Sequence, residues 1–297
     1  MNKKIVIAGG TGFIGNHLAT GFKEAGFEVL IISRRAGTIR WTNFQGILGA
    51  LENADLVVNL AGKSVDCRYN SRNKKKILTS RTLTTKILGQ AIELCKNPPA
   101  LWINASTATI YRHAEDRPMT ENQGEIGSGF SVDVATQWEK AFFTFHLERT
   151  RQVALRMAIV LGKNGGVIKP FLNLVRFGLG GPQGNGRQMF SWIHIADVFN
   201  IILFIMEHQG LSGVYNCSAP NPVTNEILMK TFRVKTNTKF SLPSPAWLLR
   251  MGAVMIKTET ELILKSRWVI PEKLLQAGYT FKYPSLDSAL ENILKHG

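Results

Sequence analysis

Short apolar runs alternate with helical patterns through the first 160 residues. In the helical stretches the apolar residues recur at four-residue spacing, as Ile14, Leu18 and Phe22 do. Short apolar strands separated by helices predict an α/β fold, a doubly wound parallel sheet covered by helices on both faces. Ligands of such sheets bind beyond the carboxyl ends of the strands, so the residues after each strand are the candidates for a site. The predicted strands are residues 4–8, 27–32, 54–60, 100–105 and 153–160.

The alternation of apolar strands and helical stretches becomes less regular after residue 160, where glycine-rich segments interrupt it. Residues 221–224 end in a threonine that is typical of a helix N-cap, and the tail holds a strand-like run at 279–283. We therefore expect a Rossmann-type domain over residues 1–165, with contributions from later segments. A smaller α+β domain on the substrate side is expected over residues 166–297.

The first predicted strand leads directly into a glycine cluster and then a helix. This order builds a site for a dinucleotide diphosphate, because the helix N-terminus offers free N–H groups and a partial positive charge. Gly9 permits the tight turn, Gly12 lets the backbone approach the phosphates, and Gly15 lets the helix pack closely on the sheet. A turn without a ligand is the alternative, and the order of the elements disfavours it. The expected contacts are Gly9, Thr11, Gly12, Phe13, Ile14 and Gly15.

The second predicted strand ends in Ser33, Arg34 and Arg35. Sites for the unphosphorylated cofactor usually carry a carboxylate here, which holds the ribose 2′-hydroxyl. A guanidinium instead grips a 2′-phosphate through charge-assisted hydrogen bonds. The sequence therefore predicts NADP(H) as the cofactor, with Arg34 as the stronger candidate. Two solvated surface arginines are the alternative.

Composition restricts the class of protein. With 297 residues, of which 44% are hydrophobic, the chain can bury a large core. It contains no apolar stretch long enough to span a bilayer, so we expect no membrane partner. Its three cysteines, Cys67, Cys95 and Cys217, give neither a disulfide framework nor metal-ligand spacing. We therefore predict a cytoplasmic protein without a metal site.

The formal net charge of +15 raises the question of nucleic acid. The basic residues are spread from end to end, with a denser segment from Lys63 to Lys86. Most of that segment is predicted to be helical from Asn70 onward, and its charges then form a solvated face. We expect no specific nucleic-acid partner. A basic field also attracts anionic cofactors and substrates, so an anionic small molecule is the expected substrate.

Several motifs together resemble those of the extended short-chain dehydrogenase/reductases. The resemblance is narrower to the atypical branch labelled "epimerase family protein". It implies an NADP-binding Rossmann domain, a smaller C-terminal part that closes over the nicotinamide, and a C-terminal module of unknown function at about 245–293. The motifs are Gly9–Gly15, Asn59–Gly62, Ser80-Arg81, Trp138-Glu139, Gly184–Asp197, Ala219–Asn225 and Pro271–Leu290.

The resemblance also places Leu60, Ala61, Gly62 and Arg81 beside the cofactor. Arg81 stands where many extended members of the superfamily have an asparagine near the active centre. Binding of an anionic substrate and capping of a helix are two further roles for this arginine.

Catalysis in the wider superfamily resembles a relay. A tyrosine transfers the proton, a lysine four residues later lowers its pKa, and a serine or threonine orients the substrate oxygen. Ser106 and Thr107 fit the last element, and Tyr111 matches the tyrosine that closes that motif. The resemblance places Thr107 at the catalytic position, where it or Ser106 polarises a carbonyl.

The tyrosine and lysine of the relay are absent. Alignment on Trp138 and Glu139 puts Ser131 in place of the tyrosine and Ala135 in place of the lysine. A serine without a partnering base is a poor acid near neutral pH, and alanine carries no charge. On a helix Lys140 would lie about 140° around the axis from Ala135, so it does not substitute for the lysine.

Five further residues are candidates for contact with substrate: Arg68, Tyr69, Gln188, Ser191 and His194. Each has a structural alternative. Tyr69 is also explained as a packed aromatic. In extended members the histidine and aspartate of the motif that contains His194 order a loop and cap the next helix. Gln188 and Ser191 line either the substrate cleft or a domain contact.

Two functions are consistent with this sequence. The first is an NADP(H)-dependent oxidoreductase or epimerase that acts on a small molecule with a nonstandard proton donor. The second is a non-catalytic module that binds NADP(H) and reports redox state to a partner. Retention of Ser106 and Thr107 favours the enzyme, and loss of the tyrosine and lysine favours the module. The chain is expected to act as a monomer or a homodimer.

Overall fold

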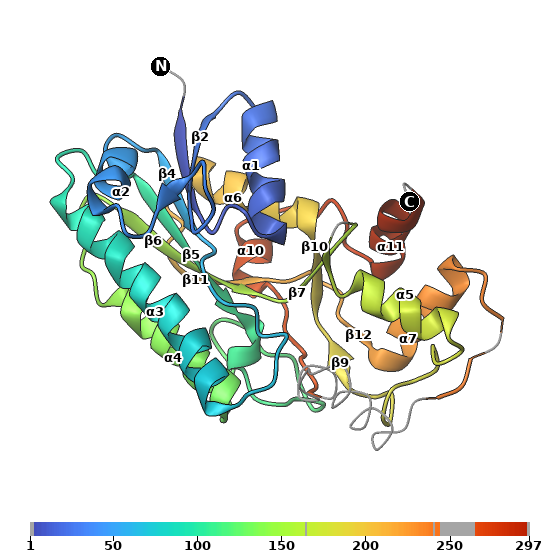
Figure 1. Ribbon diagram of the computed structural model, residues 1–297. Helices are drawn as coiled ribbons and strands as arrows, with labels where there is room; N and C mark the ends of the chain where they lie inside the picture. The colour runs from blue at the N-terminus through green and yellow to red at the C-terminus, as the bar shows by residue number, and fades with distance from the viewer. Residues whose placement is uncertain (1–2, 164, 240, 244–264, 296–297) are drawn as a thin grey trace.

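A seven-stranded parallel sheet forms the centre of the molecule (Figure 1). The structure is a computed structural model that describes residues 3–163, 165–239, 241–243 and 265–295. The strand order is β11-β6-β5-β4-β1-β2-β3, so the winding direction reverses between β1 and β4, where doubly wound folds bind their ligands. The strands are β1 (Lys4–Ala8), β2 (Glu28–Ser33), β3 (Ile39–Arg40), β4 (Leu56–Asn59), β5 (Leu101–Thr107), β6 (Arg151–Met157) and β11 (Gly213–Cys217).

Helices cover both faces of this sheet, as the apolar strand pattern predicts. Along β1, Ile5 and Ile7 face one core, whereas Val6 and Ala8 face the other, because successive side chains of a strand point to opposite sides. The first face carries α1 (Phe13–Glu24), α6 (Ile195–Glu207) and α10 (Glu272–Gln276). The second carries α2 (Phe44–Leu51), α3 (Ser71–Leu94) and α4 (Phe130–Phe143).

A smaller lobe packs beside the sheet around a separate core of apolar side chains that includes Trp192, Phe232 and Leu290. The chain enters this lobe after β6 and returns to the main sheet through α6 and β11. The lobe holds β7 (Ile159–Gly162), β8 (Gly165–Gly166), α5 (Ile168–Arg176), β9 (Met189–Phe190), β10 (Trp192–His194), β12 (Val223–Thr224), α7 (Asn225–Lys235) and α11 (Leu286–Lys295).

Thr224 caps α7 as predicted, since its hydroxyl accepts from the Ile227 N–H. Two strand predictions were wrong. The run at 153–160 divides at Ala158 into β6 and β7, and these belong to different sheets. Residues 279–283 form no strand: the N–H groups of Lys282 and Tyr283 bond to the Asp197 side chain, and that of Tyr279 bonds to the Leu274 carbonyl. Residues 245–264 of the predicted C-terminal module lie outside the described residues.

Candidate functional site

The turn between β1 and α1 is closely packed and requires glycine at two positions. Gly9 has a φ of +81°, and an added Cβ would lie 2.8 Å from the carbonyl carbon of Leu60. At Gly15 an added Cβ would lie 2.5 Å from the Gly9 carbonyl oxygen. Gly15 therefore makes room for the turn itself, rather than for the sheet as the sequence suggested. At Gly12 the nearest atom to an added Cβ would be the Gly9 carbonyl oxygen at 3.5 Å, an ordinary contact, so the protein itself leaves room for a Cβ there.

The N-terminus of α1 faces the same space without a cap. Gly12 is the N-cap residue, no side chain bonds to the first turn, and the first turn contains no acidic residue. The orphan N–H groups and the helix dipole are therefore available to an anion. Together with the open space at Gly12, this arrangement fits a dinucleotide diphosphate.

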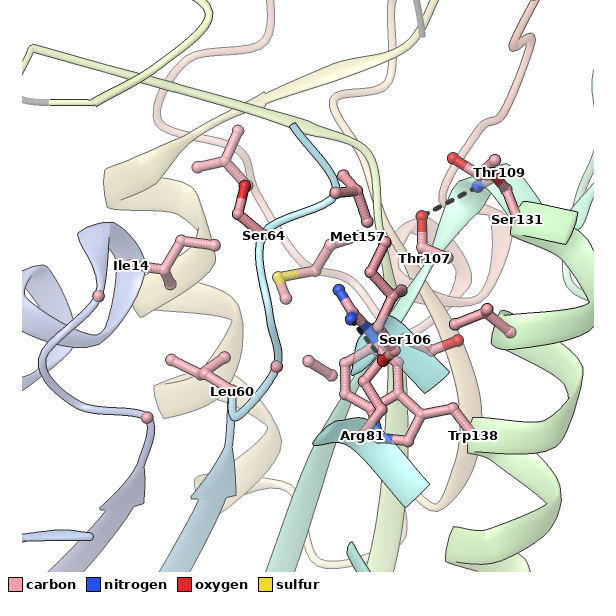
Figure 2. Close-up of a pocket in the computed structure, with 18 of the residues that line it drawn as sticks. Ile14, Leu60, Ser64, Arg81, Ser106, Thr107, Thr109, Ser131, Trp138 and Met157 are labelled. Atoms are coloured by element: carbon pink, nitrogen blue, oxygen red, sulfur yellow. Dashed lines mark hydrogen bonds between the residues drawn. The ribbon is translucent and has the colours of Figure 1, made fainter. Parts of the chain in front are cut away.

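A cavity of about 480 Å³ opens at the carboxyl ends of β1, β4, β5 and β6. Figure 2 shows Ile14 and Leu60 on one side of it and Ser106, Thr107 and Trp138 on the other. The predicted site residues that line it are Gly9, Gly12, Phe13, Ile14, Gly15, Leu60, Gly62, Tyr69, Arg81, Ser106, Thr107 and Ser131. Those that the structure places outside its lining are Thr11, Ser33, Arg34, Arg35, Ala61, Arg68, Ala135, Gln188, Ser191 and His194.

The loop after β2 presents the two predicted phosphate-binding arginines to solvent. Arg34 and Arg35 are exposed, and neither forms an ion pair with any of the residues described. Ser33 is buried, and its Oγ accepts from the Arg35 N–H and bonds to the Thr38 hydroxyl at 2.9 Å. Ser33 thus shapes the loop that carries the arginines.

A buried polar cluster holds the loop after β4. The Asn59 side chain donates to Thr85 Oγ1 and Asn104 Oδ1, and its own oxygen accepts from the Ala61 N–H. Trp138 Nε1 also donates to Thr85 Oγ1, at 3.0 Å. This cluster joins β4, β5, α3 and α4, so Leu60 and Gly62 are fixed at the edge of the cavity.

Behind the cavity lining at Ser106 lies an ion pair that the sequence did not reveal. Ser106 Oγ donates to Glu139 Oε1 at 2.6 Å, and Arg156 donates to both oxygens of Glu139 at 2.8 Å. The Arg156 guanidinium also donates to the Tyr111 hydroxyl, which in turn donates to Asn216. All these side chains are buried. The carboxylate and the phenol oxygen beside Arg156 raise the pKa of its guanidinium above its ordinary value, although burial opposes this.

Thr107 has the opposite hydrogen-bonding role to Ser106. It caps a 3-10 turn at Ala108–Ile110, where its Oγ1 accepts from the Thr109 N–H at 3.2 Å. Its hydroxyl hydrogen donates to no acceptor within the described ranges. Thr107 is half-buried and lines the cavity, so it is available as a hydrogen-bond donor to a ligand.

The positions that correspond to the usual tyrosine and lysine lie on α4. Ser131 lines the cavity. Ala135 is fully buried against Ile110, Val132 and neighbouring apolar side chains, so this position is part of the core. Lys140 lies farther along α4, is exposed, and does not line the cavity.

Arg81 extends from α3 along the cavity wall. Its Nη1 donates to the carbonyl oxygens of Lys63 and Ile77, both at 3.0 Å, and its Cζ lies 5.1 Å from the centre of the Trp138 ring. Gly62 makes room for it, because an added Cβ there would lie 3.1 Å from Arg81 Cζ. Burial lowers the pKa of Arg81 to about 10, which leaves the guanidinium charged at neutral pH.

The remaining substrate candidates have different surroundings. Tyr69 lines the cavity and packs edge-on against Phe130, with 4.9 Å between ring centres. Ser191 Oγ accepts from the Val269 N–H and donates to the Arg267 carbonyl, which ties β10 to the C-terminal segment. Gln188 donates to the Gln183 carbonyl within the smaller lobe.

His194 caps α6 and is buried. Its Nδ1 accepts from the Ala196 N–H at 3.1 Å, and its ring packs on Tyr283. Asp197 accepts from the N–H groups of Lys282 and Tyr283, which explains why residues 279–283 form no strand. The histidine and aspartate thus cap a helix and order a loop, which was the structural alternative to a substrate role.

Burial lowers the pKa of His194 to about 4 from an ordinary value of 6.5. Because the unfolded state then binds more protons, this residue stabilises the fold above about pH 6.5 and less as the pH falls toward 4. We expect His194→Asn, which keeps a capping oxygen but does not titrate, to flatten the pH dependence of the unfolding free energy in this window. Denaturant titrations at pH 7.5, 5.5 and 4.5 measure it, and an unchanged slope would contradict the prediction.

Two classes of site are not found in the described part of the chain. It contains no group of three or more His, Cys, Asp or Glu side chains arranged to hold a metal ion. No helix within it has the length and apolarity needed to cross a membrane.

Comparison with known proteins agrees with this geometry. The human epimerase family protein SDR39U1 is 32% identical over 294 residues, which cover 98% of this chain and 99% of the human protein. The epimerase family protein YfhF of Bacillus subtilis is 32% identical and covers 98% of this chain. The crystal structure of human SDR39U1 isoform 2 with NADPH superposes with a TM-score of 0.90 over 99% of this chain and 100% of the human one.

A second solved structure is a nucleoside-diphosphate sugar epimerase from Corynebacterium glutamicum, with 27% identity and a TM-score of 0.80. It covers all of this chain and 59% of its own. The profile of a domain of unknown function, DUF1731, matches residues 244–293. The profile of the NAD dependent epimerase/dehydratase family matches residues 5–218, and the chain belongs to that family.

Proposed function

We propose that this protein is an NADP(H)-dependent oxidoreductase or epimerase-like enzyme that acts on a small anionic molecule. The observation that carries the proposal is the uncapped α1 N-terminus, which faces the open space at Gly12 beside a cavity. The human relative that contains NADPH supports the same cofactor. The exposed Arg34 and Arg35 are suited to its 2′-phosphate.

When bound, the cofactor supplies or accepts a hydride. The protein then has to hold the substrate and stabilise its reacting oxygen. Thr107 performs the second task, because its oxygen already accepts from Thr109 and its hydrogen is available for a carbonyl oxygen. Ala135 supplies no charge to lower the pKa of an acid, so Thr107 stabilises the oxyanion that forms by donating a hydrogen bond to it, and the proton that completes the reduction comes from water in the open cavity.

Cofactor affinity tests the proposal. We expect NADPH to bind at least about tenfold more tightly than NADH, because charge-assisted bonds to a phosphate are each worth about 1.5–3 kcal/mol. Arg34→Ala should remove most of this difference. Arg72→Ala removes an exposed charge from α3 and should leave it unchanged. Calorimetric titration gives both affinities, and equal values for NADPH and NADH in the parent protein would refute the assignment.

A non-catalytic redox-sensing module is the second candidate, and the apolar burial of Ala135 favours it. The two are separated by oxidation of bound NADPH with a panel of aldehydes, ketones and nucleotide sugars. Turnover that Thr107→Ala abolishes supports the enzyme. Tight NADPH binding without oxidation by any compound supports the module.

A further inference from the structure

The hydroxyl of Ser106 is fixed in one orientation. Its hydrogen is donated to Glu139 Oε1 at 2.6 Å, the length of a charge-assisted bond. Ser106 also lines the cavity. A hydroxyl carries one hydrogen and two lone pairs, so the group that remains available to a ligand is a lone pair. At this point the cavity accepts a hydrogen bond and does not donate one.

The ion pair behind Ser106 keeps its hydroxyl from turning round to donate a hydrogen bond to a ligand. Arg156 donates to both oxygens of Glu139 at 2.8 Å, so both oxygens act as acceptors and Ser106 faces an acceptor. The Tyr111 hydroxyl accepts from the same guanidinium at 2.9 Å. Glu139 and Arg156 are therefore positioning residues, which act on a ligand through Ser106.

Arg81 gives the same cavity a positive charge and forms no ion pair with the residues that the structure describes. It is the one charged side chain in the described lining. Nη1 is used by two carbonyl oxygens, but Nε and Nη2 donate to no acceptor in the ranges that the structure describes. The guanidinium lies over the Trp138 ring, with 5.1 Å between Cζ and the ring centre. Such a group binds a carboxylate or phosphate through two parallel hydrogen bonds.

We infer that the cavity selects a small anion that also bears a hydroxyl group, with Arg81 binding the anionic group and Ser106 accepting from the hydroxyl. This inference rests on the proposed function, since it names the substrate class of that cavity. The two adjacent residues then have different roles. Thr107 donates a hydrogen bond to the reacting oxygen, whereas Ser106 accepts one from a hydroxyl group of the substrate.

Three small probes isolate the two contacts. Lactate has both the charge and the hydroxyl, propionate lacks the hydroxyl, and lactamide lacks the charge. None of them is oxidised or reduced by NADPH, so their affinities for the NADPH-saturated protein are measured at equilibrium by ligand-observed NMR titration. Lactate should bind about three- to tenfold more tightly than propionate, as expected for one neutral hydrogen bond, and at least about tenfold more tightly than lactamide.

Variants assign each preference to a residue. Ser106→Ala leaves the Glu139–Arg156 pair intact and should equalise lactate and propionate. Arg81→Gln should equalise lactate and lactamide, whereas Lys76→Gln, which removes an exposed charge from the same helix, should change neither ratio. Glu139→Gln gives Ser106 an N–H neighbour and should reduce the preference for lactate over propionate while propionate affinity is kept. A purely structural role for Glu139 would not move that ratio.

Some results would overturn the inference. These are equal binding of lactate and propionate, equal binding of lactate and lactamide, or no binding by any of the three. A tenfold loss of NADPH affinity in Arg81→Gln would assign the guanidinium to the cofactor instead. The same titrations on cofactor-free protein keep the two proposals apart, because probe selectivity without NADPH binding would refute the proposed function alone.

Discussion

Glu139→Ala is expected to lower the free energy of unfolding by about 3–5 kcal/mol, the cost of removing one partner of a buried ion pair. Glu139 and Arg156 are each 9% exposed. The substitution would leave the Arg156 guanidinium buried without its carboxylate and Ser106 without its acceptor. Chemical denaturation with linear extrapolation measures the loss.

Two controls test whether the unpaired buried charge causes the loss of stability. The double variant Glu139→Ala, Arg156→Met should recover much of the loss, because it leaves no buried charge unpaired. Asp116→Ala removes a carboxylate from Arg112 on the surface, where solvent screens the pair, and should lower the unfolding free energy far less than Glu139→Ala does. If Glu139→Ala costs as little as Asp116→Ala, the pair behind Ser106 is not the buried element described above.

The fold was largely predictable because the signal is local. The central strands β1, β4 and β5 are buried on both faces, so their sequences are apolar without regard to alternation, and the intervening helices show their own period. The errors have a local cause too. Tyr279 and Phe281 are buried and alternate with polar residues, as in a strand, but the Asp197 side chain takes the backbone bonds of the next two residues.

The site was predictable only where chemistry and chain position coincide. The glycine turn and Ser106 and Thr107 directly follow strands, so their place at the cavity follows from the fold. The Glu139–Arg156 pair joins a helix to a strand, and spacing along the chain does not indicate that contact. The available signal was Arg156, a charged residue that directly follows the apolar run 153–155 within β6.

Ser191 and His194 illustrate a different limit. The sequence left each of them open between contact with a substrate and a structural role. Their polar atoms satisfy backbone groups instead, at Val269 for Ser191 and at Ala196 for His194. A buried backbone group needs a partner as much as a ligand does, so polarity near a strand end does not by itself distinguish the two uses.

Gly15→Ala should weaken NADPH binding about hundredfold, or about 2.8 kcal/mol, and should also destabilise the fold. The new Cβ would lie 2.5 Å from the Gly9 carbonyl oxygen and 2.6 Å from Gly10 Cα. Both are backbone atoms of the turn beneath the expected diphosphate, so relief of the clash displaces the N–H groups that bind it. Overpacking of this kind costs about 1–3 kcal/mol of unfolding free energy.

Gly12→Ala tests the cofactor site separately from the stability of the fold. Its Cβ would meet the Gly9 carbonyl oxygen at 3.5 Å, an ordinary contact, so we expect a stability change within about 1 kcal/mol. It would nevertheless enter the space expected for the phosphates and should weaken NADPH binding at least about tenfold. Gly49→Ala, in α2 with open space around it, should leave NADPH affinity unchanged and stabilise the helix by about 0.5–1 kcal/mol. Unchanged NADPH affinity in Gly12→Ala would show that the diphosphate does not lie against this turn, because no protein atom competes for that space.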